Sequence, residues 1–476
     1  MIILGTNSIK AAGGFNVANS LRFNDGSSDS LTKTPSGAGN RRTWTYSTWL
    51  KRTTPNGFQS IMGADAASQG SGYSLFFSFD STNELIFGQG DNTWLKTNQL
   101  FRDPSAFYHI LLAVDTTNGT ANNRVRMYIN GSEVTSFGTR NNPSQNYEMV
   151  WNNTVNHSIG ADFPNSGLRN FFDGYMCETV NIDGQQLAPD QFGEFDDSGI
   201  WKPIDVSGLT FGNNGFYLDF EDSSALGNDA AGSNNFTVNN LTAIDQSIDS
   251  CTNNFATLNS LLPTFSSTFT EGNLKWTPST ASQYYWSNST FGLSQGKWYM
   301  EAKLTTAADH NVIGLSNDSA LDDTSFLAGT GGEGDANIAY QYGYKSSNGQ
   351  VYNNASGSSY GNTYTTNDII GLYLDLDNNK LYFAKNGTVQ NSGTGVSITD
   401  PGSIPGGVYF LAVADGTSSN ASVWEVNFGG TNTYSISSGN TDDNGYGNFE
   451  YSPNITGDSV AKKFYALNTK NLAEFG

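Results

Sequence analysis

Few residues of this 476-residue chain have the types and spacing that catalysis requires. It has three His and two Cys, and neither an H-E-x-x-H nor a C-x-x-C motif occurs. An E-x-D-x-x-E strand would aim a nucleophile and an acid into a glycoside-cleaving cleft. Its nearest counterpart is Glu194-Phe195-Asp196, where Gly199 stands in the place of the last Glu. We therefore predict turn or surface roles for Glu194 and Asp196, and a protein that is not an enzyme.

The other residues that could titrate or bind metal have structural explanations. His109 lies beside Tyr108 in a predicted strand, which indicates a packed core histidine. Residues 375–379 begin like a calcium loop, but Lys380 stands where an EF-hand needs Gly, so we expect a β-turn. We expect no cofactor, although a structural calcium ion on loop carboxylates remains open, with its ligands unassigned. Cys177 and Cys251 are too few for a disulfide framework, and we interpret both as buried or idle thiols.

Carbohydrate recognition is a chemistry that the composition allows. It needs aromatic faces for C–H stacking and Asn, Asp and Tyr groups for hydroxyls, and loops at the ends of a β-sandwich can supply both. The candidate loops are residues 89–95, 141–153 and 340–364. Their candidate glycan- or receptor-binding side chains are Trp94, Tyr147, Trp151, Tyr342, Tyr344, Tyr352 and Tyr360. The alternative for each is a place in the core, because the chain has 30 Phe, 23 Tyr and 9 Trp.

Such loops need a β framework, and the patterning predicts one. Gly and Asn are frequent, and period-2 runs bounded by turn residues recur along the chain, as at 43–50 and 108–114. Asn-Gly pairs at 130–131 and 386–387 follow such runs, which is a strong hairpin signal. Only residues 187–193 could form a short helix. We predict an all-β fold of two antiparallel, jelly-roll-like β-sandwich domains joined by an ordered connector.

The division of the chain follows from where this patterning strengthens and weakens. We predict an N-terminal attachment segment (1–14), a first sandwich (15–200), a connector (201–263), a second sandwich (264–430) and a C-terminal strap (431–476). The run FATLNS at 255–260 is echoed by FYALNT at 464–469. This echo indicates a chain built of sandwich-plus-strap modules.

The charge of the chain limits its partners. With 44 Asp and Glu against 23 Lys and Arg, the formal charge is -21, which disfavours binding to nucleic-acid phosphates or anionic lipid. No window reaches the roughly 20 apolar residues of a membrane span. The start MIILG has no basic residue before its short apolar run, unlike a signal peptide. We expect no nucleic-acid partner, no membrane insertion and no export by the common route.

Four segments of the first sandwich carry a family resemblance: WTYSTW at 44–49, FRDPSAFYHI at 101–110, RVRMYING at 124–131 and FDGYM at 172–176. Together they resemble the concanavalin A-like lectin/glucanase sandwich in its laminin-G-like form. Two further runs, IDGQQL at 182–187 and GFYLDF at 215–220, resemble a module of structural proteins of tailed phages, many of them marine.

The second sandwich contains GKWYME at 296–301 and the long hairpin pattern DIIGLYLDLDNNKLYFAKNG at 368–387. Both resemble the corresponding strands of the SPRY domain. Tailed-phage virion proteins often carry both domains, and residues 464–476 resemble their recurrent ending. The chain as a whole therefore resembles a tailed-phage, marine-type virion structural protein.

This resemblance implies a tail fibre or receptor-binding adhesin that recognises a host-surface glycan or protein and has other virion proteins as partners. The alternatives are an external capsid decoration and a purely architectural virion protein, while a polysaccharide depolymerase is disfavoured by the missing carboxylates. The expected location is the virion exterior, on tail or capsid, after assembly in the host cytoplasm. Because termini fray unless an assembly holds them, we expect a homo-oligomer, most simply a homotrimer with its N-terminal segment facing the virion.

Overall fold

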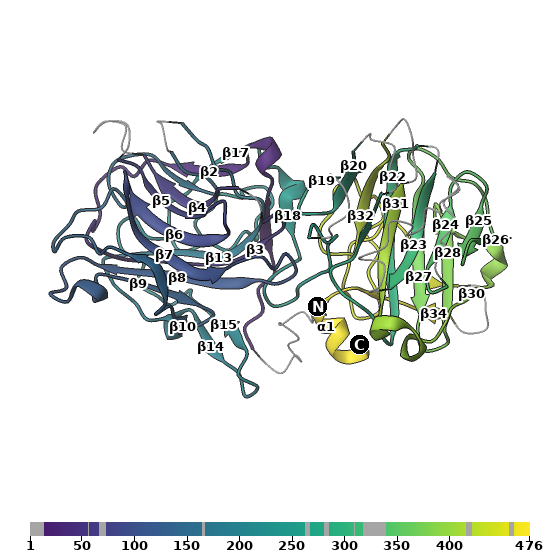
Figure 1. The fold of residues 1–476 in the computed structure, drawn as a ribbon. Coiled ribbons are helices and arrows are strands. Elements are labelled where there is room, and N and C mark those ends of the chain that lie inside the picture. Colours follow the sequence, from purple (N-terminus) through teal and green to yellow (C-terminus); the bar gives the residue numbers. More distant parts are fainter. Residues whose placement is uncertain are drawn as a thin grey trace. The chain divides into compact units, whose positions relative to one another are not determined.

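The chain forms two compact units built almost entirely of β-strands (Figure 1). The computed structural model describes residues 14–55, 57–65, 73–163, 167–261, 267–279, 285–308, 310–317, 339–415, 421–456 and 461–476. Within this part, one unit ends at Asn253 and the other begins at Asn254. The predicted all-β class with antiparallel sandwiches is confirmed. Of the predicted attachment segment 1–14, only Gly14 lies within the described residues.

The described part of the first unit has two large sheets, whose strands pair antiparallel, and a separate two-stranded sheet, β14 (Gly193–Phe195) with β15 (Trp201–Pro203). One sheet has the order β10 (Ser132–Glu133), β9 (Val125–Ile129), β8 (Tyr108–Asp115), β3 (Thr43–Arg52), β13 (Gly174–Asp183), β1 (Ser20–Phe23) and β18 (Gln246–Ser247), with β16 (Phe216–Leu218) also on β13. The other has the order β11 (Phe137–Arg140), β7 (Asn92–Leu100), β6 (Glu84–Gln89), β5 (Leu75–Phe79), β4 (Gln59–Ala64), β12 (His157–Ile159), β2 (Ser30–Lys33) and β17 (Thr237–Asn239).

Aromatic rings packed against one another form a large part of the core of the first unit. Trp44 and Tyr46 of β3 are buried, and each packs against Trp151 with ring centroids 6.2 Å apart. Phe77 of β5 meets Phe87 of β6 edge-to-face at 6.0 Å. Because side chains alternate along a strand, the runs around these residues present every second side chain to the core and the others to the opposite face.

Residues 201–253, predicted to be most of a connector, belong to the first unit. β15 (Trp201–Pro203) pairs with β14 (Gly193–Phe195), and β16, β17 and β18 each extend one of the two sheets. Phe216, Phe220 and Phe236 enter the core. The predicted range 15–200 therefore stops short of strands that complete this unit. Alternation of apolar and polar residues is weak in this stretch, and it becomes regular only by pairing with strands far away in sequence.

The described part of the second unit also has two large sheets, and its strap adds a two-stranded sheet of β33 (Asn454–Ile455) and β34 (Lys462–Lys463). One has the order β19 (Ser267–Thr270), β20 (Lys275–Pro278), β32 (Val423–Asn427), β22 (Lys297–Thr306), β27 (Ile369–Asp375), β28 (Lys380–Lys385) and β29 (Thr388–Val389), with β30 (Val396–Ser397) on β28 and β35 (Tyr465–Ala466) on β22. The other has the order β21 (Tyr285–Asn288), β31 (Tyr409–Asp415), β23 (Asn311–Asn317), β24 (Tyr342–Lys345), β25 (Gln350–Asn353) and β26 (Ser356–Ser359).

The hairpin of β27 and β28 pairs Asp375 with Lys380. The Asp375 carboxylate accepts hydrogen bonds from the backbone N of Asn378 at 3.1 Å and from its Nδ2 at 2.9 Å. This is the β-turn predicted for residues 375–379. Three fully buried tryptophans fill the core beneath the sheet: Trp276, Trp298 and Trp424.

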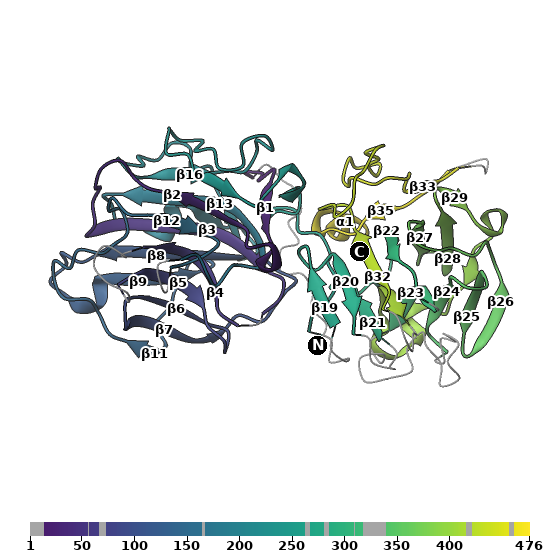
Figure 2. The same ribbon diagram turned by 90° about the horizontal axis from the view of Figure 1, so that it is seen from above.

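The C-terminal strap, residues 431–476, runs along one side of the second unit (Figure 2). The buried Glu301 carboxylate of β22 fastens it by accepting hydrogen bonds from Glu450 N (3.0 Å), Tyr451 N (2.6 Å) and Tyr434 Oη (3.3 Å) of the strap. Two groups of the sheet, Tyr299 Oη (3.0 Å) and Asn427 Nδ2 (3.4 Å), donate to it as well. Burial raises the pKa of Glu301 to about 7, against these donors, which lower it. The echoing segments lie side by side, since Ala256 N donates to Leu467 O at 3.0 Å.

The strap ends in α1 (Thr469–Phe475), whose cap residue Asn468 accepts a hydrogen bond from Asn471 N at 2.9 Å. The sequence pattern predicted no helix there. Within residues 187–193, where it allowed one, the structure has a single 3-10 turn, Pro189–Gln191. In the described part of the chain, no helix has the length and apolar character needed to cross a membrane.

Candidate functional site

The predicted glycan-contacting aromatics of the first unit lie in or against its core. Trp94 is within β7, is 5% exposed and packs on Phe87 with ring centroids 5.4 Å apart. Trp151 is fully buried. Tyr147 is half-buried, with its ring edge on Trp94 at 5.4 Å and its hydroxyl accepting from Gln89 Nε2 at 3.1 Å. This corrects the expectation for Trp94 and Trp151, because a covered ring offers no face to a sugar.

The four candidate tyrosines of the second unit are buried as well, which corrects the prediction for residues 340–364. Tyr342 and Tyr344 lie in β24 and Tyr352 lies in β25. Tyr360 packs on Tyr344 with ring centroids 5.7 Å apart, and its hydroxyl accepts from Phe383 N at 3.2 Å. Burial raises the pKa of Tyr360 to about 12. The spacing of Tyr342 and Tyr344 by two residues was itself a sign of a strand face, which is how both rings enter the core.

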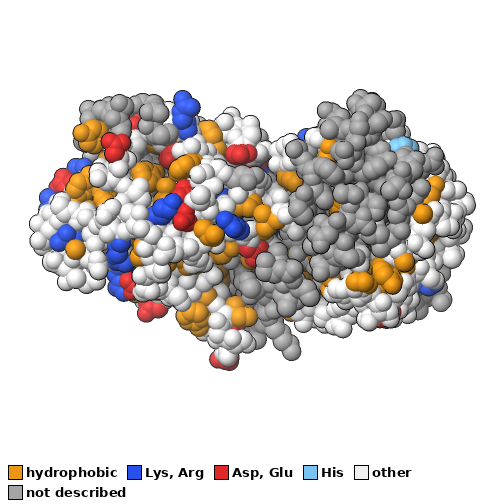
Figure 3. All heavy atoms as spheres, in the orientation of Figure 1, with side chains coloured by type: hydrophobic (Ala, Val, Ile, Leu, Met, Phe, Trp, Pro, Cys, Tyr) orange, Lys and Arg blue, Asp and Glu red, His pale blue; other side chains and the backbone are white. Residues whose placement is uncertain are grey.

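A groove of about 430 Å³ on the outer face of β5 to β7 has the composition of a ligand site. Phe77 of β5 faces the core, so its neighbours Phe76 and Ser78 face outward and line the groove. Ile86 of β6 lies beside Ser78 in register. Figure 3 shows hydrophobic side chains interspersed with acidic and basic ones on the side of the first unit that it presents. The signal in the sequence was SLFFSF at 74–79, which is apolar on both faces of one strand.

Aromatic side chains form the apolar part of the groove. Phe58, Phe76 and Phe163 line it, and Phe58 is 49% exposed although it is a large hydrophobic residue. An exposed ring beside a groove can stack on the C–H face of a ligand. Gly88 lies behind Phe76: a Cβ there would stand 2.2 Å from Asn92 O and 2.6 Å from the Phe76 ring. Glycine at 88 therefore lets the β6–β7 turn close against the ring that lines the groove.

Hydrogen-bonding groups form the other part. The Asp162 carboxylate accepts from Asn170 Nδ2 at 3.0 and 3.2 Å, and Asn170 O accepts from Ser60 N at 2.7 Å. The hydroxyls of Ser60 and Ser78 are hydrogen-bonded at 2.7 Å across β4 and β5. Burial raises the pKa of Asp162 to about 6, while its bonds from Ser60 and Asn170 oppose the shift. The groove thus combines aromatic rings with an anchored carboxylate, an amide and hydroxyls.

The charge of the groove selects against anions. Its described lining contains Asp91 and Asp162 but neither Lys nor Arg. Carboxylates accept hydrogen bonds from hydroxyl groups and repel negative charge. The groove therefore suits an uncharged, hydroxyl-rich ligand with one apolar face.

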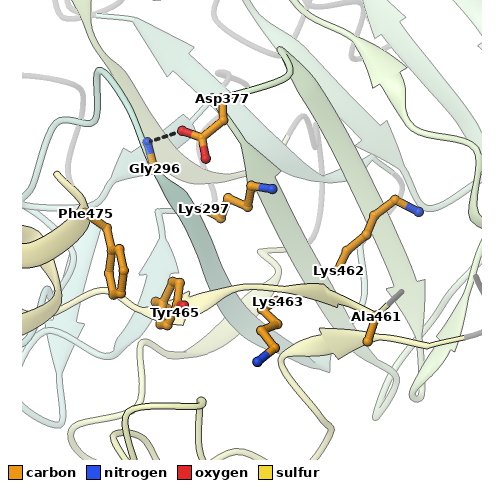
Figure 4. Close-up of a pocket in the computed structure, with 8 residues that line it drawn as sticks. All are labelled: Gly296, Lys297, Asp377, Ala461, Lys462, Lys463, Tyr465 and Phe475. Atoms are coloured by element: carbon orange, nitrogen blue, oxygen red, sulfur yellow. Dashed lines mark hydrogen bonds between the residues drawn. The ribbon is translucent and has the colours of Figure 1, made fainter. Parts of the chain in front are cut away.

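A second cleft, of about 530 Å³, lies in the second unit where the strap meets the start of β22 (Figure 4). Asp377 accepts from Gly296 N at 3.1 Å, and the strap contributes Tyr465 stacked on Phe475 with centroids 4.0 Å apart. Lys297 Nζ lies 3.4 Å from Asp375 Oδ2. The strap supplies most of the described lining residues: Ala461, Lys462, Lys463, Tyr465 and Phe475. We therefore interpret this cleft as the place where the strap packs against β22 and not as a ligand site.

The carboxylates that most resembled a catalytic pair have the predicted surface and turn roles. The Glu194 side chain is 58% exposed and lies 3.5 Å from Lys202 Nζ. Asp196 accepts from Ser198 N and Ile200 N, each at 2.9 Å, and so closes the turn between β14 and β15.

His109 is the packed core histidine that was predicted. It is fully buried, Trp201 Nε1 donates to its Nδ1 at 3.0 Å, and its Nε2 lies 2.8 Å from Ser47 Oγ. Burial lowers the pKa of His109 to about 3, so the ring is neutral. Among the residues that the structure describes, no group of three or more His, Cys, Asp or Glu is placed to hold a metal ion.

Comparison with known proteins identifies two domains. Residues 25–190 match the sequence model of the concanavalin A-like lectin/glucanases superfamily, and residues 297–449 match that of the SPRY domain. No curated protein matches the chain. Solved structures with similarity include the SPRY domain of human HERC1 (14% identity, 34% of this chain and 90% of that chain, TM-score 0.26) and a SAP-like pentraxin from Limulus polyphemus (16%, 37% and 82%, 0.29). Another is the CBM40 of a Ruminococcus gnavus sialidase (14% identity, 34% of this chain and 95% of that chain, TM-score 0.25). The chain therefore carries a concanavalin A-like lectin/glucanase domain followed by a SPRY domain.

Proposed function

We propose that this chain is a non-enzymatic binding protein that holds a neutral glycan in the groove on β5 to β7 of its lectin-like domain. The observation that carries the proposal is the groove itself, in which an exposed aromatic ring, Phe58, and a buried carboxylate, Asp162, line the same cavity. A sugar has a C–H face and a hydroxyl rim, and this lining offers a partner to each.

The biological setting that we propose is a tailed-phage virion, with the chain as a receptor-binding adhesin of the tail. Its support is the sequence resemblance, chiefly the runs at 182–187 and 215–220 together with the SPRY-like hairpin. Host-surface glycan is then the receptor, other virion proteins are partners, and a homotrimer is the simplest assembly. Electron microscopy of virions labelled with an antibody against this chain tests the setting: label on the capsid favours a decoration, and no label on virions refutes the setting.

The glycan proposal is tested by screening the purified full chain on a glycan array and measuring the best ligand by calorimetry. Phe58→Ala removes the exposed ring and is expected to weaken binding by about tenfold, because an aromatic contact is worth about 1–1.5 kcal/mol. The matched control is Phe195→Ala, which removes a ring of similar exposure, 53%, outside the groove.

Two outcomes would overturn this proposal. One is equal loss of binding in the Phe58 and Phe195 variants, which would show that the groove is not the site. The other is an array on which no neutral glycan binds, which would favour a purely architectural role. The enzymatic alternative has its own readout: release of reducing sugar from host polysaccharide by the purified chain would refute the non-enzymatic part and indicate a depolymerase.

A further inference from the structure

A lysine and an aspartate form a buried ion pair in the first unit, on the face of β3 that is turned away from the sandwich core. Lys51 Nζ donates a hydrogen bond to Asp249 Oδ2, and the two side chains are 0% and 2% exposed. Leu50, the neighbour of Lys51 in β3, faces the core, so Lys51 points to the opposite side of the sheet. Lysine is rarely buried so completely, because removing its charge and that of its partner from water is costly.

Apolar side chains enclose this pair. Lys51 Nζ lies 5.2 Å from the centre of the Phe107 ring and 4.9 Å from the centre of the Tyr175 ring. Both rings belong to a buried cluster that also contains Cys177 and Cys251, which are free, buried thiols, as the sequence predicted. Bulk water therefore has little access to the lysine and its carboxylate partner.

The apolar surroundings favour the uncharged forms of the two groups. Burial is the largest influence on the pKa of Lys51 and lowers it. The hydrogen bond and charge of Asp249 raise this pKa, as do the charges of Asp103 and Cys177. When the ammonium passes its proton to the carboxylate, a neutral amine lies beside a carboxylic acid, and no charge remains buried. An amine and a carboxylic acid are the two reactants of amide formation.

The backbone holds both reactants in place. Lys51 is paired in register with Tyr175 of β13. Asp249 N donates to Ser247 Oγ at 2.9 Å, and Asp249 O accepts from Ser20 Oγ at 2.6 Å. Because Lys51 Nζ is hydrogen-bonded to a carboxyl oxygen, it lies next to the carbon that carries this oxygen. Groups fixed in this way react as if at a very high local concentration.

We propose that Lys51 and Asp249 condense to an amide bond that cross-links the first unit. The amine nitrogen of Lys51 attacks Cγ of Asp249, and a C–N bond forms. The bond from Cγ to one carboxyl oxygen breaks, and this oxygen leaves as water with its own proton and one proton from the nitrogen. The step needs no oxidant or reductant. Its product is neutral, which removes the cost of two buried charges. This site is independent of the proposed glycan groove.

The cross-link joins the middle of one sheet to the end of the first unit. β3 lies between β8 and β13, while Asp249 follows β18 and comes shortly before Asn253, where the unit ends. The two linked residues are 198 positions apart in sequence. Closing so long a loop restricts the unfolded chain, and the last segment of the unit stays attached to β3 even when its hydrogen bonds are lost.

The test is mass spectrometry of the full chain, purified and then unfolded with a reducing agent present. We expect a mass that is lower than the sequence mass by one water molecule. Trypsin does not cleave after a lysine whose amine is bound in an amide, so digestion should give a branched peptide that joins the segments of Lys51 and Asp249. The full sequence mass, or separate peptides with both residues unmodified, would overturn the proposal.

A succinimide at an Asp-Gly pair, such as Asp25-Gly26, has the same mass as the cross-linked product. Mild alkali opens a succinimide and leaves an amide intact. A loss of water that mild alkali reverses, or that maps to an Asp-Gly pair, would therefore refute the cross-link.

Lys51→Met is the matched variant, because it keeps an unbranched side chain in the apolar cluster but has no amine. Asp249→Ala, which lacks the carboxyl group, takes its place should the Met variant not fold. Each variant is expected to have its full sequence mass. A variant that still lacks one water molecule, as wild type does, would show that the loss arises elsewhere and would refute the proposal.

Discussion

The buried Glu301 carboxylate is predicted to be the main fastening of the strap to the SPRY domain. Replacing it with Ala leaves two backbone N–H groups, those of Glu450 and Tyr451, without their acceptor, whereas Asn427 Nδ2 keeps its bond to Asn448 O at 2.8 Å. Each buried donor left unsatisfied costs about 1–3 kcal/mol, so the free energy of unfolding of the second unit should fall by about 4 kcal/mol. Glu301→Gln keeps one oxygen and should lose about half of this.

The assay is scanning calorimetry of the full chain at pH 8, above the pKa of about 7, so that the carboxylate is ionised. The transition of the second unit should move to lower temperature while that of the first unit stays in place, because every hydrogen bond that Glu301 accepts comes from the second unit. Glu474→Ala is the control, since it removes an exposed carboxylate from the same strap. If Glu301→Ala behaves like Glu474→Ala, the carboxylate does not hold the strap and the reasoning fails.

Three further perturbations have defined outcomes. Burial raises the pKa of Glu178 to about 8, so the folded state keeps a proton that the unfolded state releases near pH 4.5. The free energy of unfolding of the wild type should therefore fall as the pH rises from 5 to 8. Glu178→Gln should gain about 3 kcal/mol relative to wild type over that range in denaturant titrations. Gly88→Ala should lower the unfolding free energy of the first unit by about 2 kcal/mol, because the new Cβ meets backbone 2.2 Å away; an unchanged denaturation midpoint would contradict this. Trp201→Phe removes the donor to His109 and should cost about 1 kcal/mol, and a variant as stable as wild type would show that the bond contributes nothing.

Most of the fold could be predicted from local pattern. The hairpin of β27 and β28 is marked by alternation up to Asp375 and by the turn residues that follow, and both features depend only on neighbours in sequence. The role of His109 also followed from its place in an apolar run. The strands at 216–218 and 237–239 could not be assigned to a sheet in the same way, because their regularity comes from pairing with β13 and β2.

The aromatic residues show most clearly what local sequence pattern could not predict. Trp151 and Tyr344 lie in stretches with loop-like or mixed composition, yet both rings are fully buried. Phe58, which no pattern singled out, is the ring left exposed beside the groove. Whether an aromatic side chain fills a core or faces a ligand depends on which strands cover it, and those strands lie far away in the chain.

Composition, alternation and turn chemistry, which are local, were enough to predict an acidic, all-β protein without the spacing of catalytic residues. The lectin-like and SPRY-like character of its two sandwiches came from the resemblance of short runs to those families. Only the folded chain shows that the first unit ends at Asn253 and that Phe58 and Asp162 line the same groove. Each of these depends on long-range pairing, because an antiparallel sheet brings together residues whose positions in sequence do not reveal their distance in space.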